Sequence, residues 1–221
     1  MKNLKTKFLL FTLFCTSLAY AQITITDAVL TYTISIETTN GEKQLSSALN
    51  GATLNIYLAK DKSRTEMVSK LGTETTVFDN KLGNGFILKE YSGQKLMITT
   101  TTENWAQKNQ VNNNLAFKET AETATIAGIT CKKATAISDD GKNYTVYYDP
   151  NTIITNKKYN NAFAKLLGMP VQYSLQSGNL VFKYTLQKNN AEILPTYKFD
   201  APKAGFRVMT YEENQQMKRG D

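Results

Sequence analysis

The chain has 221 residues, of which 41% are hydrophobic and 20% charged, a composition typical of a globular protein and incompatible with disorder. It contains no histidine, which excludes Ser-His-Asp and Cys-His catalysis and any zinc site that requires imidazole. Lys and Arg outnumber Asp and Glu by 26 to 19, giving a formal net charge of +7.

Residues 1–21 have the pattern of a secretory signal peptide. Three lysines precede a largely apolar stretch at 8–18, and residues 19–21 (Ala-Tyr-Ala) supply a small-x-small cleavage pattern. The apolar stretch is too short for a membrane-spanning helix, which needs about 20 residues. We expect cleavage after Ala21, export to the periplasm or beyond, and no transmembrane segment in the mature chain.

Loss of this segment changes the charge and the cysteine content. Three lysines leave with it, so the net charge falls from +7 to +4, a mild bias that does not indicate a nucleic-acid partner. Cys15 also leaves, and Phe14 before it and the continuing apolar stretch behind it argue against a lipoprotein. Cys131 is then the only cysteine and forms no internal disulfide. We expect a buried, inert thiol, with a reactive or intermolecular thiol as the alternative.

The mature chain has a dominant hydrophobic period of two, which predicts strands. The clearest alternations run through residues 30–36, 54–58, 171–175, 180–186 and 193–199. Further strands are expected at 63–68, 73–79, 85–91, 95–101, 132–138 and 143–148. Short turn segments such as 79–85 and 177–179 join neighbours, whereas a parallel crossover needs a dozen residues or more. The sheet is therefore predicted to be mostly an antiparallel meander.

Helical patterns are few. Short helices are expected at 40–49, at 103–110 around Trp105, at 156–167 and at 210–218, the last beginning with a capping box formed by Thr210 and Glu213. No linker, composition break or internal repeat divides the chain, so residues 22–221 are predicted to form one β-rich domain.

About ten strands with so few helices must bury many apolar faces. Either one sheet curls around a core plugged by the helices, or two sheets stack as a sandwich. The curled sheet is the functionally interesting solution, because an incompletely filled interior is a hydrophobic pocket.

Two stretches near the end of the chain resemble LolA-like periplasmic carriers. Residues 166–173 and the strands after them resemble the closing hairpin of that superfamily, and 199–209 resemble its F-x-x-P-x-G ending, with two residues rather than one between Pro202 and Gly205. The stretches 51–67, 125–134 and 140–148 look more closely like a group of unknown function associated with the superfamily. The resemblance spans about 27–213.

This resemblance implies a half-barrel of antiparallel strands with helices over its mouth, enclosing an apolar cavity. The characterised relatives carry lipids or the acyl chains of lipoproteins across the periplasm. They use an arginine near the cavity to hold closed-state contacts, and Arg64 is the candidate here. An ordinary ion pair with Glu66, on the same face of the predicted strand, is the alternative.

The apolar strand faces are the only feature large enough to be a site, unless they form a filled core. The expected ligand-binding residues are Tyr32, Ile34, Leu54, Ile56, Leu58, Arg64, Phe86, Leu88, Leu96, Ile98, Phe182 and Tyr184. No catalytic residues, metal ligands or cofactor are expected.

Three functions remain open on the sequence alone. The first is a monomeric periplasmic carrier of a lipid, a lipoprotein acyl chain or another hydrophobic small molecule. The second is a non-catalytic interaction module of the cell envelope with a filled core and a protein partner. An enzyme is the least supported, because no pair of acidic residues is placed for acid–base catalysis.

Overall fold

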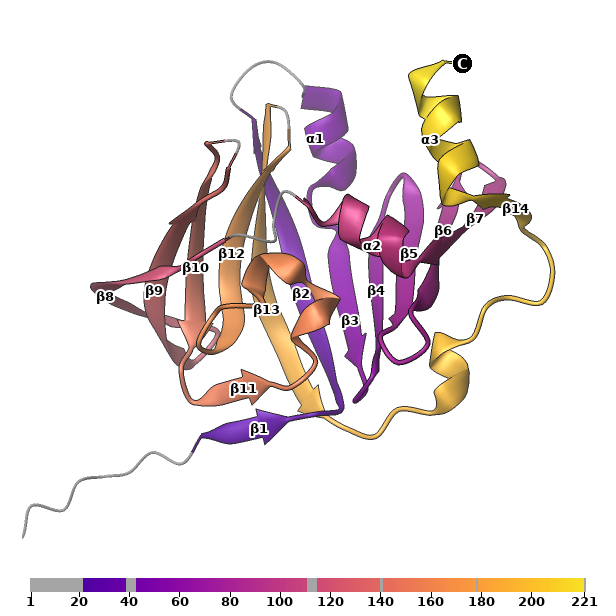
Figure 1. The fold of residues 1–221 in the computed structure, drawn as a ribbon. Coiled ribbons are helices and arrows are strands. Elements are labelled where there is room, and N and C mark those ends of the chain that lie inside the picture. Colours follow the sequence, from indigo (N-terminus) through magenta and orange to yellow (C-terminus); the bar gives the residue numbers. More distant parts are fainter. Residues whose placement is uncertain (1–21, 39–42, 111–114, 140, 178, 221) are drawn as a thin grey trace, which may run out of the picture.

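A twelve-stranded sheet organises the chain (Figure 1). The computed structural model describes residues 22–38, 43–110, 115–139, 141–177 and 179–220. The predicted signal peptide and its cleavage site at Ala21 lie outside these residues. The strands are β2 (Ala28–Thr38), β3 (Thr53–Leu58), β4 (Lys62–Ser69), β5 (Gly72–Asp79), β6 (Asn84–Tyr91), β7 (Gln94–Thr101), β8 (Lys118–Ile126), β9 (Ile129–Ile137), β10 (Asn143–Asp149), β12 (Met169–Ser177), β13 (Leu180–Ala191) and β14 (Arg207–Thr210).

The sheet is open and curled, with the order β14-β7-β6-β5-β4-β3-β2-β13-β12-β10-β9-β8. Every neighbouring pair is antiparallel except β14 and β7, which run parallel. A separate two-stranded parallel sheet joins β1 (Ile23–Ile25) to β11 (Thr152–Ile154). The curled antiparallel sheet is confirmed and the sandwich alternative is wrong; the parallel pairs and β8 were not among the predicted strands.

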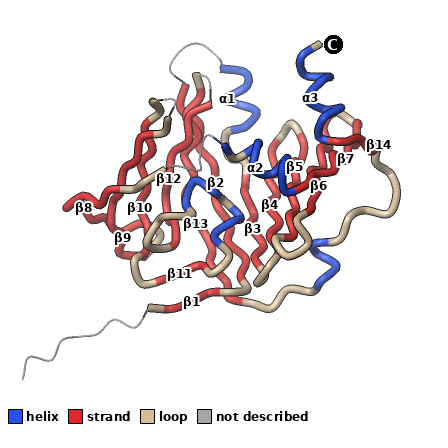
Figure 2. The backbone as a smooth tube through the Cα atoms, viewed as in Figure 1, coloured by secondary structure: helices blue, strands red, loops and turns tan. Residues whose placement is uncertain are grey.

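Register assigns each side chain to one of two faces. Ile56, Thr65, Thr76, Ile87 and Ile98 pair in succession from β3 to β7, so their side chains share a face. The sheet curls around this face, which we call the concave face, and the helical segments in its middle lie within the curl (Figure 2). We call the opposite side the outer face.

Three α-helices border the concave face or its rim: α1 (Lys43–Leu49), α2 (Thr102–Lys108) and α3 (Tyr211–Arg219). Capping boxes begin α2 at Thr101 and α3 at Thr210, and the second was predicted from sequence. No helix within the described ranges is both long and apolar enough to span a membrane.

The helix predicted at 156–167 is wrong as a continuous element. Two 3₁₀ helices, η2 (Lys157–Tyr159) and η3 (Asn161–Phe163), replace it. Asn160 separates them because its backbone is extended and its side chain accepts a hydrogen bond from the amide of Ala162, which caps η3. Of the four apolar residues expected on its buried face, Tyr159, Phe163 and Leu166 are buried, whereas Leu167 is 65% exposed.

The strand predicted at 193–199 is also wrong. Its alternation is not reflected in burial, because Phe199 is buried whereas Ile193 and Tyr197, of the same parity, are 91% and 68% exposed, and the segment ends in a 3₁₀ helix, η4 (Thr196–Phe199). It gains no ladder partner because β2 and β12 already flank β13 on both sides. The segment passes over the outer face, where Phe199 packs with Val77, Phe86 and Leu88.

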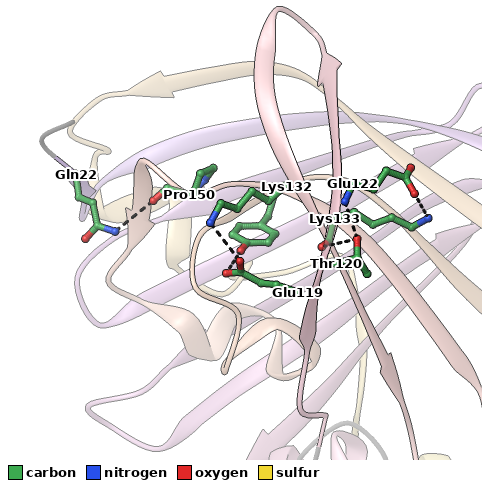
Figure 3. A network of polar contacts seen from close by, with 8 residues as sticks. Gln22, Glu119, Thr120, Glu122, Lys132, Lys133 and Pro150 are labelled. Atoms are coloured by element: carbon green, nitrogen blue, oxygen red, sulfur yellow. Dashed lines mark hydrogen bonds and ion pairs between the residues drawn. The ribbon is translucent and has the colours of Figure 1, made fainter. Parts of the chain in front are cut away.

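The edge strand β8 is polar and paired by charge to its neighbour β9 (Figure 3). Lys132 Nζ lies 3.2 Å from Glu119 Oε2, and Lys133 Nζ lies 2.7 Å from Glu122 Oε2. A register irregularity between Glu119 and Thr123 further interrupts the ladder. Charges and bulges of this kind discourage pairing with a second sheet, so this edge is protected against edge-to-edge association.

Candidate ligand-binding cavity

One half of the concave face is filled. Tyr32, Leu58 and Val171 belong to a continuous buried cluster, into which Tyr159 and Phe163 of the 3₁₀ segment insert. The segment is anchored by polar contacts as well as by packing, because Asn156 Nδ2 donates to the carbonyls of Ala59 and Lys62, both at 3.0 Å. This half of the concave face therefore has the filled core that was expected as the alternative to a cavity.

The other half of the concave face contains a cavity of about 440 Å³. It lies between β3–β5 on one side and β12–β13 on the other, bordered by α2 and the 3₁₀ segment. Its lining combines aliphatic, aromatic and a few polar side chains: Leu54, Ile56, Thr65, Met67, Glu74, Thr76, Trp105, Lys108, Asn109, Tyr159, Asn160, Tyr173, Leu175 and Tyr184. This volume is typical of a small-molecule site.

Helix α2 is fixed over the cavity by contacts to the sheet and to a second helix. Trp105 stacks on Phe78 of β5 with ring centroids 4.4 Å apart and an interplanar angle of 15°. Asn104 Nδ2 donates to Glu212 Oε1 of α3 at 2.6 Å, which ties the two helices together. This hydrogen bond and the Thr101 capping box hold the helix that carries Trp105 and Lys108.

A stack of aromatic rings forms the wall contributed by β12 and β13. Tyr173 and Tyr184 stack with centroids 4.6 Å apart, and Phe163 meets Tyr173 edge-on at 4.7 Å. Burial raises the pKa of Tyr184 to about 12, and burial together with nearby tyrosines raises the pKa of Tyr173 well above its usual value. These phenols are neutral at physiological pH, so this wall offers an uncharged surface with polar tips.

The polar side of the cavity is formed by β5, β6 and α2. Glu74 Oε2 lies 3.7 Å from Lys89 Nζ and accepts a hydrogen bond of 3.4 Å from Tyr91 Oη. Lys108 Nζ stands 5.5 Å from the centroid of the Trp105 ring, a cation–π contact.

Three of the predicted site residues line this cavity: Leu54, Ile56 and Tyr184. Six more lie on the concave face without lining it. Tyr32 and Leu58 are in the filled cluster, Ile34 is 1% exposed, and Phe182 is half-buried on β13. Leu96 and Ile98 pack with Met209 and Tyr211 in a separate cluster.

The remaining three predicted residues, Arg64, Phe86 and Leu88, lie on the outer face. Arg64 and Phe86 both pair with Val77, and Leu88 pairs with Met97, whereas Leu96 and Ile98 have the opposite parity. The expectation that they share a face with the other nine is corrected by this register. Arg64 forms the ion pair foreseen with Glu66, at 2.6 Å, and also donates to the carbonyl of Lys198 at 3.3 Å.

Sequence reasoning predicted a short helix at 103–110, close to α2, but it missed most of the polar lining and the place of that helix over the cavity. Thr65, Met67, Glu74 and Thr76 could have been found by extending the pairing from Ile56 across β4 and β5, since register fixes the face. Trp105 and Lys108 carry no such signal, because the short helix around them depends on tertiary contacts.

A second hollow of about 440 Å³ lies on the outer face, between residues 199–201 and strands β5–β7. Its lining includes the ion pair of Lys62 and Asp79, with Nζ and Oδ2 3.4 Å apart, and Asp200. Because its wall is a loop segment and its charges include a mutually satisfied pair, we regard the concave cavity as the better ligand site. Among the described residues no group of His, Cys, Asp and Glu could hold a metal ion.

No protein family model and no curated protein matches the chain. Among solved structures, an uncharacterized conserved protein from Thermus thermophilus matches with a TM-score of 0.51 and 11% identity, over 84% of this chain and 90% of that one. The lipoprotein LppX of Mycobacterium tuberculosis matches with a TM-score of 0.37 and 12% identity, over 77% of this chain and 89% of that one. A LolA superfamily protein from Nitrosomonas europaea matches with a TM-score of 0.34 and 6% identity, over 80% and 90%.

The superfamily that the sequence resembles is thus among the structural matches. The Thermus protein shows a shared fold and nothing about activity, and the two lower TM-scores support no further argument.

Proposed function

We propose that this protein is an exported, non-catalytic binding or carrier protein for a hydrophobic ligand, such as a lipid or a lipoprotein acyl chain. The observation that carries the proposal is the cavity of about 440 Å³ on the concave face. The resemblance of the sequence to periplasmic carriers and the predicted signal peptide at 1–21 support the compartment.

The chemistry of the lining favours an apolar ligand. Leu54, Ile56, Met67 and Leu175 supply aliphatic surface, and the stacked pair of Tyr173 and Tyr184 adds a flat, uncharged wall. Burial of apolar area is worth about 25 cal/mol per Å², so an acyl chain gains affinity without directional contacts. The tyrosines of the cavity are held neutral and its carboxylate is paired, which suits binding better than proton transfer.

The filled half of the concave face gives this cavity a rigid floor. The 3₁₀ segment occupies the space beside β12, and the cavity begins where Tyr159 and Asn160 end that packing. A ligand would therefore enter a largely preformed site, which limits the ordering cost of binding.

Filling the cavity tests the proposal. Thr65 is half-buried on the concave face and lines the cavity, so Thr65→Phe should occupy it. Thr73, half-buried on the outer face of β5, provides the matched control Thr73→Phe. The probe is N-phenyl-1-naphthylamine, a neutral dye that fluoresces in apolar sites.

We expect Thr65→Phe to weaken dye binding at least about tenfold while Thr73→Phe and the wild type bind equally. The smaller substitution Thr65→Leu should give an intermediate loss and guards against misfolding of the Phe variant. Unchanged dye binding by a folded Thr65→Phe protein would contradict the assignment of the cavity.

A further inference from the structure

The polar side of the concave cavity has an excess of positive charge. Glu74 is the only carboxylate in its described lining, and Lys89 directly opposite it on β6 already neutralises that charge. The hydroxyl of Tyr91 also donates to Glu74 at 3.4 Å. The acceptor capacity of Glu74 is thus partly used within the protein.

Lys108 has no such partner. It lines the cavity and forms no ion pair with a carboxylate among the described residues; its close contact is the Trp105 ring, 5.5 Å away. Although part of the side chain is exposed, desolvation lowers the pKa of its ammonium, Lys89 and Lys218 lower it further, and Glu74 opposes them. Lys108 is nevertheless exposed, so it is a cation at the cavity that has no carboxylate partner among the described residues.

A second donor beside Lys108 is also unsatisfied. Trp105 lines the cavity, and its indole Nε1–H is buried without a hydrogen-bond acceptor in the described part of the chain. Buried donors without acceptors are uncommon in folded proteins, and each one calls for a specific reason. Because this N–H has almost no accessible surface, an anion in the cavity would contact Lys108 rather than the indole.

We infer that the cavity binds a single-chain amphiphile with an anionic head group, a carboxylate or a phosphate, held at Lys108. The apolar tail lies along Leu54, Ile56 and the Tyr173–Tyr184 wall, on the side away from the Glu74–Lys89 pair. This inference rests on the proposed function, because it names the ligand class of the same cavity. A head group that pairs with Lys108 forms a charge-assisted hydrogen bond, which is stronger than a hydrogen bond between neutral groups.

The test compares ligands that differ only in the head group. Dodecanoic acid, dodecyl phosphate and dodecan-1-ol compete for bound N-phenyl-1-naphthylamine at pH 7 and moderate salt, at concentrations where each ligand is monomeric. The proteins are wild type, Lys108→Met and the control Lys132→Met, whose lysine pairs with Glu119 on the distant edge of the sheet. Methionine keeps much of the aliphatic stem and removes the charge.

We expect at least one of the two anions to bind the wild type about tenfold more tightly than the alcohol. The better anion identifies the preferred head group. In Lys108→Met this preference should fall to near unity while alcohol binding is kept, and Lys132→Met should behave as wild type.

Two results overturn the inference while leaving the proposed function intact: equal binding of all three ligands by the wild type, or an anion preference that survives in Lys108→Met. A failure of all three ligands to displace the dye would overturn the proposed function together with the inference.

Discussion

Trp105 of α2 and Phe78 of β5 stack with ring centroids 4.4 Å apart, so the helix that covers the cavity is fixed to the sheet by one aromatic pair. Both residues lie on the concave side of the molecule, and Phe78 is 4% exposed. Since α2 also carries Lys108, this contact positions the Lys108 ammonium as well as the helix itself.

Removing the stacking contact between Trp105 and Phe78 should loosen the attachment of α2 to the sheet. Trp105→Ala should lower the free energy of unfolding by about 2 kcal/mol, less than a fully buried aromatic truncation because the ring is half-buried. At this chain length that corresponds to a fall of roughly 4–8 °C in Tm, measurable by differential scanning calorimetry. Trp105→Phe should keep most of the stability. An unchanged Tm in Trp105→Ala would mean that the stack does not hold α2.

Loss of the hydrogen bond between α2 and α3 should affect the local stability of α2 more than the stability of the whole fold. Asn104→Ala removes both the capping-box side chain and the 2.6 Å contact to Glu212. Each is worth about 1 kcal/mol. Hydrogen exchange in α2 should accelerate severalfold, whereas Gln107→Ala, an exposed change on the same helix, should leave it unchanged. Equal exchange in the two variants would contradict this role.

Arg64 is predicted to stabilise the outer face rather than bind ligand. Its guanidinium joins Glu66 to the carbonyl of Lys198 and so fastens residues 192–206 to β4. Arg64→Met should cost about 1 kcal/mol, the upper end for a partly exposed ion pair, and should leave dye affinity unchanged. A large loss of affinity at unchanged Tm would instead restore the role that the carrier resemblance implied.

Asp79 should make stability depend on acid pH. Desolvation alone would raise its pKa, but backbone hydrogen bonds from Leu82 and Lys81 and the ion pair with Lys62 outweigh this and lower it. A carboxylate with a depressed folded pKa contributes stability above its unfolded pKa of about 3.9, and that contribution is lost as pH falls through the folded value.

Asp79→Asn should therefore destabilise by about 1 kcal/mol at pH 7, and the difference from wild type should shrink below about pH 4. Chemical denaturation across pH 2–7 measures it, with the exposed Asp200→Asn as the control. A difference that is constant over this range would show that the charge of Asp79 is irrelevant.

Cys131 should be unreactive in the native mature protein. Its side chain is fully buried, and burial, assisted by Asp149 and opposed by a backbone hydrogen bond from Ile126, raises the thiol pKa to about 11. Because thiolate is the nucleophile, maleimide labelling at pH 7 should be slow until denaturant unfolds the chain. Rapid labelling without denaturant would indicate that the β8–β9 hairpin opens.

Period-two alternation predicted most strands of the sheet, because apolar residues on the buried face of a strand alternate with more polar residues on its other face. Strands β3 and β13 lie where the alternation predicted them, around Leu54 and Ile56 in β3 and around Phe182 and Tyr184 in β13. The same rule failed at 193–199, a segment that crosses the outer face without joining the sheet. Ile193 and Tyr197 are exposed there although they share parity with the buried Phe199, so alternation alone specifies neither the burial nor the hydrogen-bond partners of this segment.

The site was predicted only in part because alternation gives relative faces within a strand and not between strands. Phe86 and Leu88 were grouped with Leu96 and Ile98, yet the turn at 92–93 pairs Leu88 with Met97 and reverses the assignment. Trp105 and Lys108 enter the cavity through a seven-residue helix whose position depends on Phe78 and Glu212, contacts remote in sequence.

Native mass spectrometry of the protein, purified without detergent from the organism that makes it, tests the central claim most directly. We predict a protein beginning at Gln22 with a reproducible added mass that solvent extraction recovers as an anionic acyl compound. A bare protein mass, together with no uptake of dodecanoic acid or of the neutral dye by the same preparation, would contradict this prediction.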